Sequence, residues 1–356
     1  MKYDGYTDVI NAGLRQSPRL TQASFTSLSG VFIMPPDDRV YTYSTVLMGS
    51  PILLKLFEPN QPLALLVFKR IKQLEDELTV NRAHSDVMTI NQAAGKHPII
   101  VSQPLFNLIK RAKEVSLLED SGFNFTIGPV VKRWRIGFHG RSVPPADELQ
   151  ALLALTDPRC VVLNAQQRSV WLEKAGMEID LGAIAKGYIA DVIRQLLYQQ
   201  HVYHALINLG GNVLAIGRPQ NGGQTVWSVG LQKPFGDDGE LIGMIHVANK
   251  SVVTSGIYER YFECDGRVYH HILDPKTGYP LDNELLSVTI ISDASIDGDI
   301  YTTLIYGLGV EKGLAYLSRL PHIEAILVTK DRRVMLSSQR QYDFTLLDTE
   351  YERVVL

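Results

Sequence analysis

The chain has 356 residues, which is more than one small module needs and enough to bury a core without disulfides or a structural metal. Its 45% hydrophobic and 21% charged residues are typical of a globular protein and exclude a disordered or collagenous chain. Lys and Arg number 35 against 38 Asp and Glu, so the net charge is −3. With no strongly basic stretch, nucleic-acid binding is not expected. Cys160 and Cys264 are too few and too far apart for a disulfide framework or a thiolate zinc site.

The first residues give expectations about location and domain organisation. Asp4 and Asp8 stand where a signal peptide would need a basic start and an apolar run, and no apolar stretch reaches the roughly 20 residues of a membrane helix. We therefore expect a cytoplasmic protein with no membrane span. Residues 1–40 end in a Pro-Pro-Asp-Asp turn signal and are expected to be an N-terminal extension, followed by one main domain at 41–356.

The first half of the main domain mixes strands and helices. Residues 42–58 are rich in β-formers and interrupted at Gly49-Ser50-Pro51, which predicts two strands or one broken strand. A helix is predicted from Pro62 and another from Pro104. A Pro-bounded stretch at 144–158 holds a helix that leads into a strand, and it is the expected boundary if the domain divides into two lobes.

The second half predicts more strands than helices. A strand that ends at Asp180 and Leu181 should turn at Gly182 into a helix from about Ala183. Strands then dominate up to residue 256, and the last third adds a helix that opens at 297–299, a second helix at 311–320 and closing strands. Because strands come in runs rather than in strict alternation with helices, we predict an α+β fold with largely antiparallel sheets flanked by helices.

The first of four polar clusters is the segment from Asp180 to Gly187. Gly182 can take a positive φ at the predicted turn, and the helix N-terminus that follows offers N–H groups to an anion such as a pyrophosphate. Lys186, one turn into the helix, could reach a phosphate or pair with Asp180. A plain strand-to-helix turn with a salt bridge is the alternative.

Two further clusters combine glycine with amide or imidazole groups. Gly210 and Gly211 interrupt an apolar strand pattern, which indicates a bound group, close backbone packing or a β-bulge. His271 precedes an Asp-Pro-Lys-Thr-Gly turn and could donate to a phosphate or transfer a proton. Because adjacent strand residues face opposite ways, we expect only one of His270 and His271 in a site, and a pair of surface histidines is the alternative.

The fourth cluster lies at the start of a predicted helix. Asp299 and Thr303 are four residues apart, so they share one helix face and present a carboxylate and a hydroxyl. Two such oxygens, completed by water and phosphate oxygens, are a usual set of magnesium ligands. The alternative is an Asp at the helix N-cap with Thr merely on the helix.

The order of these motifs resembles the ApbE family of FAD:protein FMN transferases. The matching stretches are DLGAIAKGYIAD, INLGGN, SGIYERYFE, HHILDPKTG and a GD-x-x-x-T helix start, together with MGSPI, SDVMTINQAAG and GFNFTIGP. The resemblance covers about residues 41–340 and implies an ApbE-like fold. It also implies Mg²⁺-dependent transfer of FMN from FAD, through a phosphoester bond, to a threonine of an acceptor flavoprotein, with release of AMP. An FAD pyrophosphatase that yields FMN and AMP and a non-catalytic FAD carrier are the alternatives.

The resemblance also assigns roles to residues of this chain. The metal ligands would be the side chains of Asp299 and Thr303 and the backbone carbonyl of Ala183. His271 would carry a proton or bind phosphate, and the base that activates the acceptor hydroxyl is left open between His271 and Asp274. Contacts to flavin or nucleotide are assigned to Met48, Gly122, Phe123, Asn124, Asp180, Lys186 and the backbone around Leu273.

Two positions depart from the family pattern. The family loop is commonly Phe-Asp-Pro-Thr, whereas this chain has Phe-Asn-Phe-Thr at 123–126, so Asn124 removes one carboxylate. Asn81 stands about where some members place an aromatic residue near the flavin. Both changes leave the predicted metal ligands in place and concern only the contacts to adenine or isoalloxazine.

Overall fold

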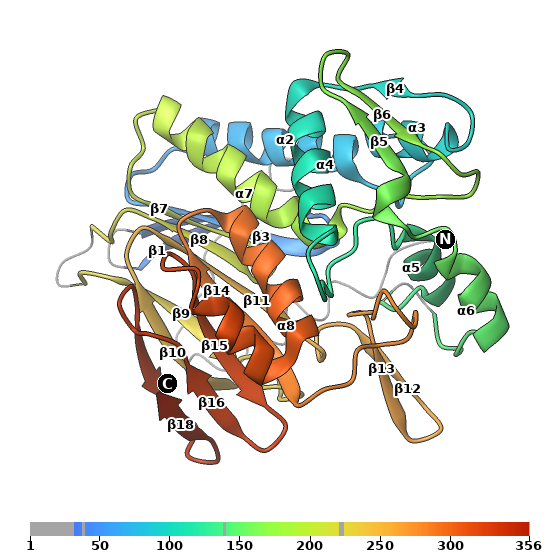
Figure 1. Cartoon of the computed structure of the whole chain (residues 1–356). Coiled ribbons are helices and arrows are strands. Elements are labelled where there is room, and N and C mark those ends of the chain that lie inside the picture. The colour runs from blue at the N-terminus through green and yellow to red at the C-terminus, as the bar shows by residue number, and fades with distance from the viewer. Residues whose placement is uncertain (1–31, 38–39, 138–139, 221–223, 356) are drawn as a thin grey trace.

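A large, mostly antiparallel sheet forms the centre of the computed structural model, which describes residues 32–37, 40–137, 140–220 and 224–355 (Figure 1). All neighbouring strands in this sheet are antiparallel except β16 and β18, which confirms the predicted antiparallel α+β fold. In spatial order the strands are β1 (Phe32–Asp37), β2 (Val40–Leu47), β3 (Ser50–Leu56), β7 (Ala205–Leu209), β8 (Asn212–Ile216), β11 (Lys250–Gly256), β14 (Leu285–Ser292), β15 (Glu324–Thr329), β16 (Arg333–Leu336) and β18 (Glu352–Val355).

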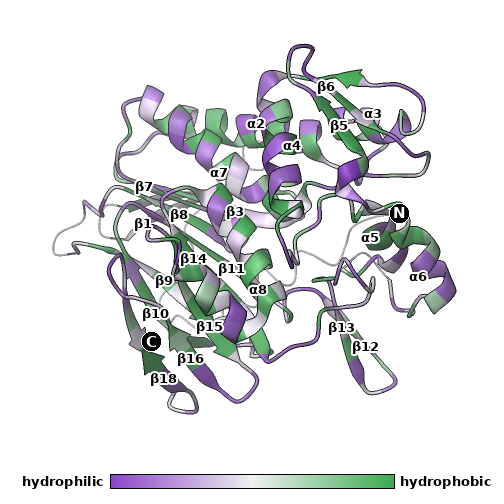
Figure 2. Ribbon diagram, in the orientation of Figure 1, coloured by the Kyte–Doolittle hydropathy of each residue, from purple (hydrophilic) through white to green (hydrophobic). Residues whose placement is uncertain are grey.

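Helices cover one face of the large sheet, and the hydrophobic residues of its strands lie against them (Figures 1 and 2). The longest helix, α8, packs on β11 and β14 and crosses α7. The helices are α2 (Gln61–Leu78), α3 (Asp86–Gln92), α4 (Gln103–Ser116), α5 (Gly128–Trp134), α6 (Ala146–Leu153), α7 (Gly182–Gln199) and α8 (Ser295–Leu317). Within the described ranges, no helix has both the length and the apolar character needed to cross a membrane.

Smaller sheets complete the molecule. Strands β17 (Asp343–Leu346), β10 (Leu241–Val247) and β9 (Trp227–Gln232) cover the other face of the large sheet, so neighbouring residues of β8 enter different cores: Leu214 faces the helices and Val213 faces this small sheet. That is why every residue of β8 is buried. Strands β4 (Ile99–Ile100), β6 (Ser169–Leu172) and β5 (Val161–Asn164) form a second small sheet, and β12 (Tyr261–Cys264) pairs with β13 (Arg267–His270) in a separate hairpin.

The beginning of the chain is only partly covered by the structure. Of the expected extension 1–40, residues 1–31 lie outside the described residues, and 32–37 form β1, which pairs with β2. The two strands expected in 42–58 are confirmed as the β2–β3 hairpin, whose turn residues Met48 and Gly49 have φ values of 53° and 68°. Helix α6 and strand β5 lie where they were expected, and the division into two lobes near 144–158 stays a prediction.

Three local expectations are corrected. Gly210 and Gly211 do not interrupt a strand: they form the two-residue turn of the β7–β8 hairpin, with φ values of 61° and 95° that favour glycine. The strand expected to end at Asp180 and Leu181 is not formed: between β6 and α7 only an isolated bridge joins Glu178 to Ile127. The two helices expected after residue 297 are segments of α8, which breaks at Gly309, where φ is 74°.

Candidate active site

The crossing of α7 and α8 depends on Gly187. A Cβ on this residue would lie 2.3 Å from the backbone oxygen of Ser295 and 2.7 Å from the Cα of Ile296, so only glycine allows the two helices to come this close. One turn further along α7, the carboxylate of Asp191 accepts the N–H groups of Ser295 and Ile296, each at 2.9 Å. Asp191 therefore caps α8, and the sequence reasoning missed it because the cap lies about a hundred residues before the helix that it serves.

Asp299 is brought to this crossing and held there. Its Oδ2 accepts the N–H of Gly187 at 2.6 Å, and its Oδ1 accepts the side-chain amide of Asn212 at 3.0 Å. Asn212 is fixed in turn by Ser295, whose hydroxyl donates to its Oδ1 at 2.8 Å. Because α8 begins at Ser295 after Ala294, Asp299 lies inside the helix, and the alternative of an N-cap is wrong. Asp299 is 8% exposed, and burial raises its pKa to about 7.

Lys186 lies between α7 and the β7–β8 turn. Its Nζ donates to the carbonyl of Gly210 at 3.2 Å, and it forms no ion pair with Asp180 in the described part of the chain. Burial lowers the pKa of Lys186, and the negative charges of Glu259 and Asp299 oppose that shift. The side chain is thus a half-buried amine close to two carboxyl groups, those of Glu259 and Asp299.

The turn of the β2–β3 hairpin lies beside the same group. A Cβ on Gly210 would come within 2.5 Å of the Cβ of Ser50, so the turns of the two hairpins are in direct contact. This contact places the Met48–Gly49 turn next to the carbonyl that Lys186 binds. The predicted residues Met48 and Lys186 are therefore brought together, although about 140 residues separate them.

Asp180 holds the start of α7. Its Oδ1 accepts the N–H of Gly182 at 2.7 Å, and its own N–H donates to the carbonyl of Phe125 at 2.8 Å. Burial raises the pKa of the Asp180 carboxyl, and the positive charge of Arg260 opposes this. Gly182 does not take the positive φ that was expected; it is the first residue of α7, and a Cβ there would lie 3.0 Å from the Asp180 carboxylate.

The loop that contains Gly122, Phe123 and Asn124 packs mainly against protein. Gly122 touches α8, because a Cβ on it would lie 2.8 Å from the Cα of Gly307. Phe123 is buried in the core, and the side-chain amide of Asn124 donates to the carbonyl of Thr156 at 2.8 Å. The Phe123 side chain is thus buried and the Asn124 amide is partly engaged inside the protein, and the predicted flavin contacts of this loop stay predictions.

His270 and His271 face different surroundings, as their adjacency predicts. His270 is buried, and its Nε2 donates to the carbonyl of Leu281 at 2.9 Å, so the alternative of a surface pair is wrong. In His271 the Nδ1 lies 3.2 Å from the carbonyl of Arg260, which can only accept, so Nδ1 carries the proton and Nε2 keeps a lone pair. Burial lowers the pKa of each histidine to about 4, which keeps both imidazoles neutral near pH 7.

The carboxylate of Asp274 stabilises the turn in which it lies. Its Oδ1 accepts the N–H of Lys276 at 2.9 Å, and its Oδ2 accepts the hydroxyl of Thr277 at 3.0 Å. Leu273, just before it, is buried and pairs with Pro280. Of the two candidate bases, His271 has an unshared lone pair and Asp274 is engaged in turn hydrogen bonds.

The predicted metal ligands offer oxygen atoms only. Ala183 lies exposed in the first turn of α7, and its carbonyl oxygen has two lone pairs, so it keeps acceptor capacity even when one of them accepts a helix N–H. The hydroxyl of Thr303 lies 3.5 Å from the backbone oxygen of Asp299. The described residues contain no group of three His, Cys, Asp or Glu side chains that would bind a metal by themselves. A carbonyl, a carboxylate and a hydroxyl nevertheless fit a Mg²⁺ ion that takes its remaining ligands from phosphate and water.

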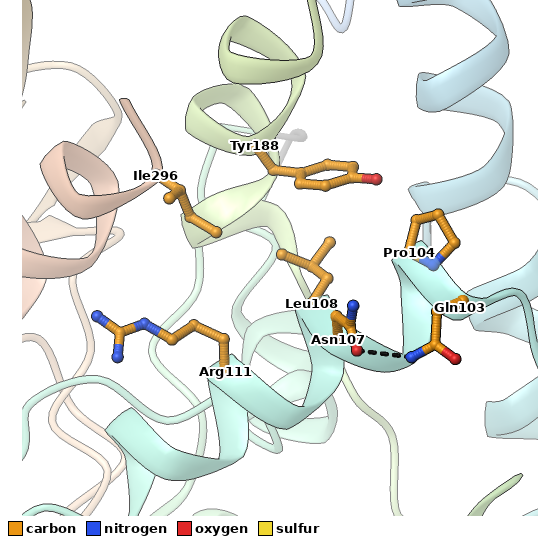
Figure 3. A pocket seen from close by; sticks show the side chains of 7 residues that line it. All are labelled: Gln103, Pro104, Asn107, Leu108, Arg111, Tyr188 and Ile296. Atoms are coloured by element: carbon orange, nitrogen blue, oxygen red, sulfur yellow. Dashed lines mark hydrogen bonds between the residues drawn. The ribbon is translucent and has the colours of Figure 1, made fainter. Parts of the chain in front are cut away.

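Two surface pockets flank the site. One, of about 430 Å³, lies on the outer side of the helix crossing, where Tyr188 and Ile296 face Leu108 of α4 (Figure 3). None of the predicted site residues lines it. The other, of about 240 Å³, is bounded by Gly122 and Asp274 together with polar and charged residues.

Fold and site together define an α+β protein with an oxygen-donor site where two helices cross. The chain belongs to the ApbE family, whose model matches residues 48–327. An FAD:protein FMN transferase of Klebsiella pneumoniae (strain 342) is 58% identical over 89% of this chain and 98% of its own length. One from Treponema pallidum (strain Nichols) is 39% identical over 76% of this chain and 78% of its own length.

Solved structures agree with this assignment. The ApbE protein of Thermotoga maritima has a TM-score of 0.73 and 29% identity, over 87% of this chain and 97% of its own. The apo form of the flavinyl transferase ApbE of Pseudomonas stutzeri has a TM-score of 0.71 and 27% identity, over 87% and 95%. The predicted family and ApbE-like fold are confirmed.

Proposed function

We propose that this chain is an FAD:protein FMN transferase that uses Mg²⁺, places FMN on a threonine hydroxyl of an acceptor flavoprotein and releases AMP. The observation that carries the proposal is the buried Asp299 carboxylate at the helix crossing, beside Lys186 and within a chain whose relatives bear that name. A flavin carrier would have no use for a cation site of this kind.

In this proposal different residues of the chain bind the metal and the diphosphate. Asp299, Thr303 and the carbonyl of Ala183 would hold the metal, which when bound supplies positive charge to the diphosphate oxygens. The charge of Asp299 acts on the pKa of Lys186, so the two groups are close together. Lys186 can donate Nζ–H to a phosphate oxygen. The fixed position of both groups favours one orientation of the diphosphate.

His271 is the base in this proposal. Its Nδ1–H is held by the carbonyl of Arg260, and its neutral Nε2 can accept the proton of the threonine hydroxyl. The hydroxyl oxygen then bonds to the FMN-side phosphorus, the anhydride P–O bond breaks, and AMP leaves with the electron pair. Water in place of threonine would give FMN and AMP, which is the pyrophosphatase alternative.

One chromatographic assay tests the proposal. FAD is incubated with the purified chain in Mg²⁺ or in EDTA, with and without an acceptor flavoprotein, and FMN, AMP and protein-bound flavin are measured. The proposal expects covalent flavin and an equal amount of AMP only with Mg²⁺ and acceptor, and no label when the acceptor threonine is replaced by valine. Free FMN and AMP with every acceptor unlabelled would favour the pyrophosphatase. FAD binding that withstands EDTA without any AMP would favour a carrier.

A further inference from the structure

The β12–β13 hairpin stands out from the body of the molecule and starts and ends at the candidate active site (Figure 1). Arg260 directly precedes β12, and His271 directly follows β13, with its N–H bound to the carbonyl of Arg260 at 3.1 Å. The tip is a two-residue turn, with φ of 50° at Asp265 and 72° at Gly266. Whatever binds the base of this hairpin is therefore next to His271.

One face of the hairpin is anchored. Phe262 and Tyr269 stack with their ring centres 5.3 Å apart, and Tyr269 lies 5.7 Å from Trp134 of α5. Because strand residues alternate between faces, Tyr261, Glu263 and Val268 belong to the opposite face. Tyr261 and Val268 are each 40% exposed, so the fixed hairpin presents apolar surface to solvent.

Phe235 extends this surface from the β9–β10 loop. Its ring is 47% exposed and meets Tyr261 edge-on at a centroid distance of 5.2 Å. Its φ is 57°, a left-handed conformation that is unfavourable for a bulky side chain. The ring also meets Tyr258 at a centroid distance of 6.0 Å, so one side of it is packed, and its exposed part is typical of a binding surface. We call Phe235, Tyr261 and Val268 the aromatic patch.

The charges beside the aromatic patch that have no ion-pair partner within the described ranges are acidic. Glu263 on the hairpin and Asp237 on the Phe235 loop are exposed and unpaired there, whereas Lys233 of that loop is paired with Asp348 and Glu350. The exposed Arg267 belongs to the opposite face of the hairpin, with Phe262 and Tyr269. An apolar surface next to such carboxylates complements a protein segment that carries an apolar side chain and a lysine or arginine.

We propose that the aromatic patch binds the acceptor flavoprotein and determines which protein segments are modified. This inference rests on the proposed transferase function. An apolar side chain of the acceptor packs between Phe235 and Tyr261, a basic side chain lies near Glu263, and the segment is thereby held beside His271.

The test separates recognition of the acceptor from cleavage of FAD. The probe is an acceptor flavoprotein of Klebsiella pneumoniae, produced without covalent flavin, and the variants are F235A, Y261A and E263Q. Tyr203, a 54%-exposed tyrosine in ring contact with Tyr198 on α7, supplies the matched control Y203A. FAD affinity and the thermal midpoint are measured for every variant to show that the fold and the nucleotide site are intact.

If the aromatic patch binds the acceptor, its variants change the KM for the acceptor and leave FAD affinity unchanged. F235A and Y261A raise KM for the acceptor about tenfold with FAD affinity unchanged, whereas Y203A changes neither. Wild-type KM rises between about 50 and about 300 mM salt, and it rises less in E263Q. An unchanged KM in F235A and Y261A, with the wild type still active, overturns the docking inference alone. A wild type that labels no acceptor at all overturns the transferase function itself.

Discussion

The backbone N–H of Gly187 donates to the carboxylate of Asp299 at 2.6 Å and so ties the first turns of α7 to α8. Ala183, one turn before Gly187 on α7, brings its backbone carbonyl to the same end of the helix. One hydrogen bond therefore positions the carboxylate beside this end of α7, so the site depends on how closely the two helices pack.

The close helix packing makes Gly187→Ala a strong perturbation. The new Cβ would collide with the backbone of Ser295, so we expect a loss of about 3 kcal/mol in unfolding free energy and a fall in transferase activity. Gly313→Ala is the control, because its Cβ would come no closer than 3.0 Å to the side-chain methyl of Ile305 and 3.4 Å to the backbone oxygen of that residue. Urea denaturation measures both, and wild-type stability in Gly187→Ala would contradict the proposed role of the crossing.

Asp191 should matter as the cap of α8. Asp191→Ala leaves two helix N–H groups and the ion-paired Arg194 without their acceptor, and we expect a loss of about 2 kcal/mol together with reduced kcat. Asp191→Asn keeps one acceptor oxygen and should lose less. The comparison needs only urea denaturation and initial rates. Equal stability of Asp191→Ala and wild type would show that the cap is not needed.

Restoring the family carboxylate at position 124 is expected to destabilise this chain. In Asn124→Asp the amide that donates to Thr156 is lost and a carboxylate faces a carbonyl oxygen, which costs about 1–3 kcal/mol. The loss should shrink near pH 4, where the new carboxyl is protonated and can donate again. Thermal unfolding at two pH values measures this, and a variant more stable than wild type at pH 7 would refute it.

The buried His270 predicts a stability loss in acid. Its pKa is about 4 in the folded protein and about 6.5 when unfolded, so between these values the unfolded chain binds more protons. The stabilisation is complete above pH 6.5 and falls as the pH drops, by about 2 kcal/mol at about pH 5. His270→Gln should flatten this part of the stability curve, measured by urea denaturation from pH 7 to pH 5. Parallel curves for the two proteins would exclude His270 as the cause.

Local patterns in the sequence predicted the elements that local physics determines. The apolar stripe from Val67 to Leu78 and the proline at 104 correctly placed α2 and α4, and their periodicity needs no distant partner. The glycines at 210 and 211 were misread because apolar residues on both sides suggested one strand. The structure instead has a hairpin in which the Gly-Gly pair, a common hairpin-turn sequence, joins two largely buried strands.

In the candidate site, too, local patterns predicted only the relationships within one helix. The pairing of Asp299 and Thr303 on one helix face follows from spacing, whereas the roles of Asp191, Asn212 and Ser295 depend on tertiary contacts. An N-cap that comes from another helix leaves no mark near the helix that it caps. Asn124 was predicted from family position alone, and only the structure shows that its amide is used inside the protein.

In the proposed mechanism Asp299, with Thr303 and Ala183, binds the divalent cation on which FAD cleavage depends. This role is tested by titrating Mg²⁺ into wild type and Asp299→Asn while AMP release from FAD is measured with acceptor present. The asparagine keeps the shape of the side chain but only one of its two acceptor oxygens, so the thermal midpoint is measured alongside, and in the folded variant the AMP rate should drop about 100-fold or more. An Asp299→Asn variant that releases AMP at the wild-type rate with the same Mg²⁺ dependence would contradict the account.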